Sequence, residues 1–205
     1  DVVLRWLPIE RLPLVHAALV DADLALTGAG TIVDVTSCPG ATSCQLAVTT
    51  SRGAARSLTD ALTLDAALVA AAPDLTIKIS GCPNSCGQHH VAAIGLQGGV
   101  RKLGGRAVPQ YLLHVGGATT ATGARFGRLV AKIPARRLPA AIAALAQLVA
   151  RDRRPGEAAA DVLFRQDDAA LDAALAGLGE LSAADATEPD FVDLDDGETR
   201  HVVAA

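Results

Sequence analysis

Two close pairs of cysteines constrain this chain more than any other feature of its sequence. Five residues separate Cys38 from Cys44, three separate Cys82 from Cys86, and the chain has no other cysteine. The longer gap suits an iron–sulfur cluster better than a tetrahedral zinc site, where gaps of about two to four residues are usual. The spacing therefore favours a cluster, with a zinc site or buried free cysteines as alternatives. Disulfides are a weaker alternative, because compact pairs suit a metal and an intracellular setting is expected.

Each cysteine pair is predicted to follow a strand and to precede a helix. A β-branched run at residues 31–35 leads to Cys38, and a β-rich run at 75–80 leads to Cys82. Thr42 or Ser43 is expected to cap a helix over residues 44–58. A helical turn would place Cys82 and Cys86 on one face, and free N–H groups at helix N-termini would stabilise the thiolates.

The rest of the chain shows alternating strand and helix patterns. A short strand is predicted at residues 1–6, and apolar spacing predicts a helix within residues 8–24. Residues 91–117 contain two strand-like runs around a glycine-rich turn, which is typical of a hairpin. Further elements are predicted in the order helix at 58–74, strand at 128–134, helix at 135–154 and helix from 156 to about 179.

Charge is distributed unevenly along the chain. Residues 181–205 carry seven acids and one base, whereas residues 1–180 carry 15 acids and 17 bases. The acidic segment has few apolar residues and is predicted to be mobile. The net charge of −4 and an aromatic content of 2% argue against a nucleic-acid partner. No apolar run reaches the length of a membrane span, so no membrane association is expected.

The sequence around the cysteines resembles a known family. The first pair lies in TSCPGATSCQLAVTTSRG and the second in IKISGCPNSCGQHHVAAIGLQGG. Both stretches resemble the ferredoxin-type nitrite and sulfite reductases, which are sirohaem enzymes with a coupled [4Fe–4S] cluster. VPQYLLHVGG and RRPGEAAADVLFR resemble later family segments, so the likeness extends over roughly residues 1–165.

The resemblance implies a ligand set and a fold. Cys38, Cys44, Cys82 and Cys86 would ligate the [4Fe–4S] cluster, and Cys86 would also be the axial ligand of the sirohaem iron. Asn84 matches a position beside the macrocycle, where it could make a polar contact. The implied fold is an α+β domain with a mixed sheet and flanking helices, like the 4Fe–4S domain of nitrite and sulfite reductases.

The same resemblance divides the chain into four parts. Residues 1–33 would be the end of a ferredoxin-like half-domain, and residues 34–165 the sirohaem and cluster domain. Residues 166–180 would form a helical extension and residues 181–205 the acidic tail. The chain resembles the second half of the family only, and the cations that hold the substrate lie mainly in the first half. The N-terminal half of the same protein is therefore an expected partner.

The implied activity is the six-electron reduction of nitrite to ammonia or of sulfite to sulfide in the cytoplasm. Electrons would come from ferredoxin or a similar acidic donor. Gln88 looks more like the nitrite-reducing branch, because the sulfite branch more often has Arg there. The alternatives are an electron-transfer module that carries a [4Fe–4S] cluster without sirohaem, and a zinc-stabilised structural domain. A related sirohaem-family enzyme of corrin synthesis ranks below the reductases.

Histidines, glycine pairs and basic clusters are further candidates for function. His89 and His90 follow the second cysteine pair, where a packing role is favoured over proton transfer. Gly98-Gly99 and Gly104-Gly105 are interpreted as hairpin turns rather than phosphate-binding loops. Three basic clusters could help an acidic donor to dock, and they consist of Arg101, Lys102 and Arg106; Lys132, Arg136 and Arg137; and Arg151, Arg153 and Arg154.

Overall fold

The centre of the fold is a five-stranded mixed sheet in the order β1-β2-β3-β4-β7. The computed structural model describes residues 3–25, 27–121 and 123–194. The first three strands are parallel and the last three antiparallel. Their bounds are Thr36–Ser37 for β1, Ile77–Ser80 for β2, Ile94–Leu103 for β3, Arg106–Val115 for β4 and Arg128–Pro134 for β7. This mixed sheet with flanking helices confirms the predicted fold class.

A tight hairpin joins the two longest strands. Strands β3 and β4 pair in continuous register from Ile94 opposite Val115 to Leu103 opposite Arg106. Gly104 and Gly105 form the turn with φ angles of +57° and +82°. Two residues with positive φ give the turn that matches the twist of paired strands, so glycines are favoured at both positions. The predicted hairpin and its turn at Gly104-Gly105 are confirmed, but Gly98 and Gly99, which were also expected in a turn, lie inside β3 and pair with Tyr111 and Gln110 of β4.

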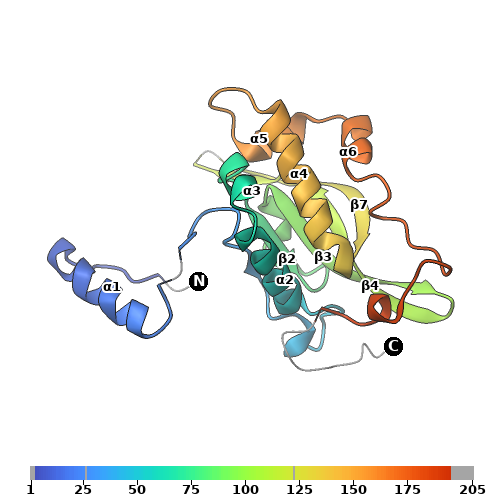
Figure 1. Cartoon of the computed structure of the whole chain (residues 1–205), viewed down its shortest axis with the longest axis horizontal. Coiled ribbons are helices and arrows are strands. Elements are labelled where there is room, and N and C mark those ends of the chain that lie inside the picture. The colour runs from blue at the N-terminus through green and yellow to red at the C-terminus, as the bar shows by residue number, and fades with distance from the viewer. Residues whose placement is uncertain (1–2, 26, 122, 195–205) are drawn as a thin grey trace.

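Helices that precede β2 in the chain and helices that follow β7 lie together as one layer against the sheet (Figure 1). They are α2 (Ser51–Thr63), α3 (Ala66–Ala71), α4 (Leu138–Asp152) and α5 (Ala159–Arg165). Helix α4 buries a stripe spaced three and four residues apart, which includes Leu138, Ile142, Leu145 and Val149. These side chains belong to the same apolar cluster as Ile77, Ile79, Ile94 and Leu96 of the sheet. Helix α6 (Asp168–Ala174) follows α5 and packs on α4 and β7.

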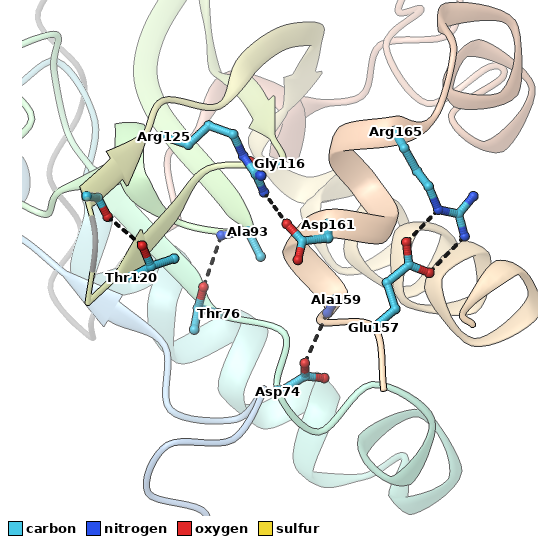
Figure 2. A network of polar contacts seen from close by, with 11 residues as sticks. Asp74, Thr76, Ala93, Gly116, Thr120, Arg125, Glu157, Ala159, Asp161 and Arg165 are labelled. Carbon is cyan, nitrogen blue, oxygen red and sulfur yellow. Dashed lines mark hydrogen bonds and ion pairs between the residues drawn. The ribbon is translucent and has the colours of Figure 1, made fainter. Parts of the chain in front are cut away.

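A small second sheet was not predicted from the sequence. Strands β5 (Ala118–Thr120) and β6 (Gly123–Arg125) pair antiparallel. Figure 2 shows Arg125 reaching from β6 toward Asp161 of α5, and the two side chains form an ion pair at 2.8 Å. The Arg125 Nε also donates to the Gly116 carbonyl at 2.7 Å. One arginine therefore ties the small sheet to the helical layer.

The N-terminal segment lies apart from the sheet and its helices (Figure 1). A 3-10 helix, η1 (Ile9–Arg11), leads into α1 (Leu12–Asp21), and neither contains a buried residue. Large apolar side chains here are open to solvent, with Trp6 94% and Ile9 82% exposed. The predicted helix is confirmed, but the described residues 3–6 form no strand. That prediction was wrong because a strand needs a pairing partner, and the described chain provides none for this segment.

Two predictions near the first cysteine pair were also wrong. Residues 31–35 are not a strand, since β1 contains only Thr36 and Ser37. The helix expected over residues 44–58 begins at Ser51, and residues 44–50 form turns after the short 3-10 helix η2 (Gly40–Thr42). Contacts with distant backbone groups hold residues 44–50, as described below, and those contacts replace the helical hydrogen bonds.

The acidic segment is partly ordered against the body of the protein. Residues 188–191 form the 3-10 helix η5 (Glu188–Phe191), and Asp193 is only 4% exposed. The sequence predicts mobility over residues 181–205, whereas residues 181–194 make defined contacts. Residues 195–205 lie outside the described residues. The remaining 3-10 turns are η3 (His89–Val91) and η4 (Ala135–Arg137). Within the described ranges, no helix is long and apolar enough to cross a bilayer.

Candidate iron–sulfur site

The first cysteine of each pair lies at the same edge of the sheet. Cys38 directly follows β1, and Cys82 follows β2 with only Gly81 between. Strands β1 and β2 are parallel neighbours, with Ser37 opposite Ile79. The Cys38 amide continues the ladder by donating to the Ile79 carbonyl at 3.0 Å. Because the carboxyl ends of parallel strands meet at one edge, the two cysteine segments begin side by side.

Backbone contacts hold the first cysteine segment onto the second. The amides of Val48 and Thr49 donate to the Gly81 carbonyl at 2.9 and 3.3 Å. Within the segment, the Cys44 amide donates to the Gly40 carbonyl at 3.0 Å, and the Ala41 amide donates to the Thr49 carbonyl at 2.9 Å. Residues 38–51 therefore form a folded loop with its centre on Gly81, which explains the absence of the predicted helix.

Glycines allow this close approach. A side chain at Gly81 would place its Cβ 2.7 Å from the Thr49 carbonyl oxygen and 3.1 Å from the Gly40 Cα. Gly40 has φ of +63°, and a Cβ there would lie 2.5 Å from the Ser51 amide. A third glycine, Gly98 of β3, faces the Gly81 carbonyl carbon with equally little room. The cysteine segments are thus packed backbone against backbone, where no side chain fits.

The second cysteine segment is a series of turns and contains no α-helix. Ser85 and Gln88 have left-handed φ angles of 58° and 60°. The Gln88 amide donates to the Ser85 carbonyl at 2.7 Å, and the Gly87 amide donates to the Ser80 hydroxyl at 3.0 Å. The expected helical turn across Cys82 and Cys86 was therefore wrong. Two non-glycine residues with positive φ reverse the chain there, which a helix does not allow.

The four thiols differ in exposure and none forms a disulfide. Cys38 and Cys82 are buried, Cys44 is half-buried, and Cys86 is exposed. The Gly81 amide donates to the Cys38 Sγ at 3.2 Å, and the Ser51 hydroxyl lies 3.2 Å from the same sulfur. Donors aimed at a sulfur stabilise a thiolate or a negatively charged cluster. This donor set fits an iron–sulfur centre.

Two neighbours of Cys38 were not anticipated from the sequence. Arg52 lines a surface hollow of about 220 Å³ together with Ser37, Cys38 and Pro39. Ser51 and Arg52 were assigned to the interior of a predicted helix, so no local pattern marked them. Their role depends on the loop that precedes α2.

The sulfur atoms do not form a compact single-ion site. Among the described residues, no group of three or more His, Cys, Asp or Glu side chains is close enough to hold one metal ion. Four sulfurs around one zinc ion would lie about 3.8 Å apart, given a Zn–S bond of about 2.3 Å. A four-iron cluster has no such requirement, because each cysteine binds a different iron. Asn84, the remaining predicted site residue, is exposed in the turn between Cys82 and Cys86.

Three histidines pack together behind the second cysteine segment. The ring of His89 lies 4.1 Å from that of His90 and 5.4 Å from that of His114, and His90 stacks on Phe126 at 5.3 Å. His89 is fully buried. Burial, together with the neighbouring imidazoles, lowers the pKa of His89 from 6.5 to about 4. A neutral, packed His89 agrees with the packing role that the sequence favours.

The basic clusters are largely engaged within the chain. Six of their nine side chains make contacts with carboxylates or backbone carbonyls, and these are Arg101, Arg106, Arg136, Arg137, Arg151 and Arg153. Arg106 forms a bidentate pair with Glu188 at 2.7 and 2.8 Å. Arg101 and Arg137 donate to backbone carbonyls between residues 177 and 181. The C-terminal segment thus covers much of the charge that the sequence assigns to donor docking.

The fold and this edge of the sheet agree with comparisons to known proteins. The family model for the nitrite and sulphite reductase 4Fe-4S domain matches residues 28–163. The chain therefore belongs to this family of 4Fe-4S domains.

Relatives and a solved structure agree with this family assignment. The sulfite reductase [NADPH] hemoprotein beta-component of Methylobacterium nodulans is 36% identical over 93 residues, which is 45% of this chain and 14% of that protein. The corresponding protein of Bordetella petrii is 39% identical over 95 residues, with 44% and 14% covered. The structure of the Mycobacterium tuberculosis NirA protein matches with a TM-score of 0.65 and 26% identity, covering 80% of this chain and 31% of NirA. This chain thus spans only a minor part of the length of the proteins it matches.

Proposed function

We propose that this chain is the cluster-bearing half of a sirohaem nitrite or sulfite reductase. Cys38, Cys44, Cys82 and Cys86 would hold a [4Fe–4S] cluster, and the exposed Cys86 would also ligate the sirohaem iron. The observation that carries the proposal is the meeting of both cysteine segments on Gly81, whose amide donates to the Cys38 sulfur. Membership of the 4Fe-4S domain family and the hemoprotein relatives support it.

The chain's own residues would hold and orient the metal centre. When bound, the cluster and sirohaem supply electrons and a substrate-binding iron for six-electron reduction of nitrite to ammonia or sulfite to sulfide. The buried Cys38 and Cys82 would anchor the cluster against the sheet, while Cys86 faces outward. The Gly81 amide would stabilise charge on the Cys38 sulfur. Asn84, exposed between Cys82 and Cys86, is proposed to contact the macrocycle.

The choice between the two anions is open to a direct test. The relatives are named as sulfite reductases, whereas Gln88 resembles the nitrite-reducing branch. In the structure, the Lys78 ammonium donates to the Gln88 side-chain oxygen at 2.8 Å. An arginine at position 88 would bring two cations together, so the glutamine suits its neighbour. Turnover of nitrite and of sulfite by the same preparation, compared as kcat/KM, distinguishes the two substrates.

Two partners belong to the proposal. The N-terminal half of the same protein would cover the exposed apolar segment around α1 and supply the cations that bind the substrate. Ferredoxin or a similar acidic protein would deliver electrons in the cytoplasm. Steering by positive charge predicts that donor-dependent turnover falls as ionic strength rises. A rate that does not change with salt would contradict an electrostatically guided donor.

The first experiment is metal analysis of the full-length polypeptide purified without oxygen. Iron and acid-labile sulfide in a ratio of five to four, together with a sirohaem spectrum, are expected, because the sirohaem adds one iron to the four of the cluster. Iron and sulfide without sirohaem, after cofactor loss is excluded, would indicate an electron-transfer module. Zinc without sulfide would overturn the proposal. Replacement of each cysteine by serine should remove most of the cluster iron, with Leu46→Ser as an exposed control in the same loop.

A further inference from the structure

The C-terminal segment runs back from the helical layer to the first cysteine segment. It lies beyond residues 28–163, the part of the chain that the family model matches. In Figure 1 this red segment descends from α6 and ends near α2. Arginines on β3, β4 and η4 bind it along the way. At its end, Arg106 also lies over the Phe191 ring, with its guanidinium carbon 3.7 Å from the ring centroid.

Asp193 ends this path at the start of α2. Its carboxylate is buried and accepts a hydrogen bond from the Thr50 amide at 2.7 Å. The Thr50 hydroxyl in turn donates to the Leu194 carbonyl. Thr50 is the N-cap residue of α2, and its side chain makes no capping hydrogen bond. Asp193 thus supplies, from 143 residues away, the acceptor for the N-cap amide that an N3 side chain supplies in a capping box.

The same helix start is attached to the first cysteine. The Ser51 hydroxyl donates to the Cys38 carbonyl at 3.0 Å and lies 3.2 Å from the Cys38 Sγ. Thr49, one residue before the cap, accepts from the Ala41 amide inside the cysteine loop. Residues 49–51 are therefore bonded on one side to Cys38 and Ala41 of the cysteine loop. On the other side, Thr50 is bonded to Asp193. A displacement of the helix start would move the Cys38 sulfur.

Asp193 and Cys38 both affect the pKa of Tyr111, a buried residue of β4. Burial is the largest cause that raises the pKa of its hydroxyl, and the negative charges of Asp193 and Cys38 raise it further. Asp193 and the Cys38 sulfur therefore act electrostatically on the same buried hydroxyl. The carboxylate lies in the low-dielectric surroundings of the first cysteine, where charge interactions are weakly screened.

We propose that Asp193 is a positioning residue for the iron–sulfur site. It fixes the start of α2, and through Ser51 it holds Cys38 in place as a cluster ligand. Its negative charge also makes the cluster harder to reduce, because reduction adds an electron near a buried carboxylate. This proposal rests on the proposed function for its consequences at the cluster. The geometric part, that Asp193 orders residues 49–51, stands without it.

Two variants separate the charge of Asp193 from its contact. Asp193→Asn removes the charge but keeps an oxygen that can accept from Thr50, whereas Asp193→Ala removes both. Glu188→Gln is the matched control, because it removes an acidic side chain of the same segment that pairs with Arg106 and not with α2. In the full-length polypeptide, we would measure the transfer of iron to a chelator and the midpoint potential of the cluster.

The expected pattern differs between the variants. Asp193→Ala should release iron about tenfold faster than the wild type, in line with the loss of a charge-assisted hydrogen bond from the N-cap amide. Both Asp193 variants should raise the midpoint potential. Glu188→Gln should change the rate of iron release by less than twofold and leave the midpoint potential unchanged. A purely structural role would accelerate iron loss without shifting the potential of a well-folded Asp193→Asn protein. Wild-type behaviour of both Asp193 variants would overturn the proposal.

A measurement without metal separates this proposal from the proposed function. If the wild type carries no iron and sulfide, the reductase assignment fails, but the geometric part remains testable. Amide hydrogen exchange of residues 47–54 and labelling of the Cys38 thiol should then be about tenfold faster in Asp193→Ala than in wild type or Glu188→Gln. Equal rates in all three proteins would refute the positioning role.

Discussion

Gly81 is the residue on which both cysteine segments depend. Its carbonyl accepts two amides from the loop after Cys44, and its own amide donates to the Cys38 sulfur. No space remains for a Cβ between it, Thr49 and Gly40. A single residue thus sets the spacing between two chain segments that are 38 residues apart, counted from Cys44 to Cys82.

Gly81→Ala should therefore damage the site and the fold together. The new Cβ would lie 2.7 Å from a backbone oxygen, which cannot rotate away as a flexible side chain can. We expect a loss of about 1–3 kcal/mol in the free energy of unfolding and a lower iron content. Denaturant unfolding and iron analysis test this. In the control Gly99→Ala, the Cβ meets only the end of the Leu112 side chain, at 3.1 Å, so a smaller effect is expected.

His89 makes the stability of the chain sensitive to acid. The unfolded state takes up a proton near the ordinary pKa of 6.5, whereas the folded state does so only near pH 4. Between these values the unfolded state binds more protons, so stability falls as pH is lowered from about 6.5 to 4. Above this window the neutral form prevails in both states, and the contribution of His89 no longer changes. The effect is at most about 3 kcal/mol.

Melting temperatures at pH 7.5, 6 and 5 test the contribution of His89. The wild type should lose stability with acid more steeply than His89→Gln, which cannot titrate at this position. His16→Gln, on the exposed face of α1, should behave like the wild type. Equal slopes for wild type and His89→Gln would show that the imidazole does not titrate as the structure indicates. Any acid sensitivity of a metal centre is common to the wild type and the variants, so it cancels when their slopes are compared.

Local sequence patterns predicted most of the helices and the long strands, and they missed the irregular parts of the site. The run that ends at Gly81 was predicted as a strand, and the four cysteines stood out by their spacing. Residues 44–50 were predicted as helix because their own side chains allow one, but their amides bond to Gly81 instead. The positive φ angles of Ser85 and Gln88 had no signal, since neither residue type requires them. The contact of Asp193 could not be predicted from a local pattern, because its partner, Thr50, is 143 residues away.

At the scale of elements, Arg125 fastens the small β5–β6 sheet to its surroundings. It bonds to Gly116 and Asp161 (Figure 2), and its guanidinium lies 4.1 Å from the Phe164 ring centroid. The strands are only three residues long, which explains why no periodic pattern predicted them. A hairpin this short depends on what it packs against.

Arg125→Ala should loosen this hairpin and leave the main sheet intact. Amides at residues 118–120 and 123–125 should exchange faster, while those of β3 and β4 keep their protection. The global free energy of unfolding should fall by about 1 kcal/mol, the combined effect of a surface ion pair and a cation–π contact. Hydrogen exchange measured by mass spectrometry resolves the two regions. Arg151→Ala, which removes an exposed pair with the adjacent Asp152, should change neither.

At the scale of the whole molecule, the N-terminal segment is the part without a core. Eight large apolar side chains between Val3 and Val20 are exposed, and α1 buries none of its residues. The body, in contrast, has one continuous apolar cluster from α2 to α6. Exposed apolar area on this scale marks a surface that another part of a protein covers.

Ile9→Lys distinguishes a covered segment from a solvent-exposed one. Ile9 is 82% exposed, so the substitution should change the stability of this chain alone by no more than about 0.5 kcal/mol. In the full-length polypeptide, the same change should cost several times more, because a lysine would be buried against the N-terminal half. Parallel denaturant titrations measure both effects. Equal, small effects in both proteins would contradict the proposed contact.

The hydrogen bond between Asp193 and Thr50 also sets an order in time. Thr50 is made 143 residues before its partner. At a synthesis rate of about 5–20 residues per second, this delay lasts roughly 7–30 s. Cys82 and Cys86 are made within this interval, so for its later part all four cysteines are present while the start of α2 still lacks its final acceptor. We expect the nascent chain to keep these thiols accessible to delivery of iron and sulfide until the C-terminal segment arrives and closes the loop.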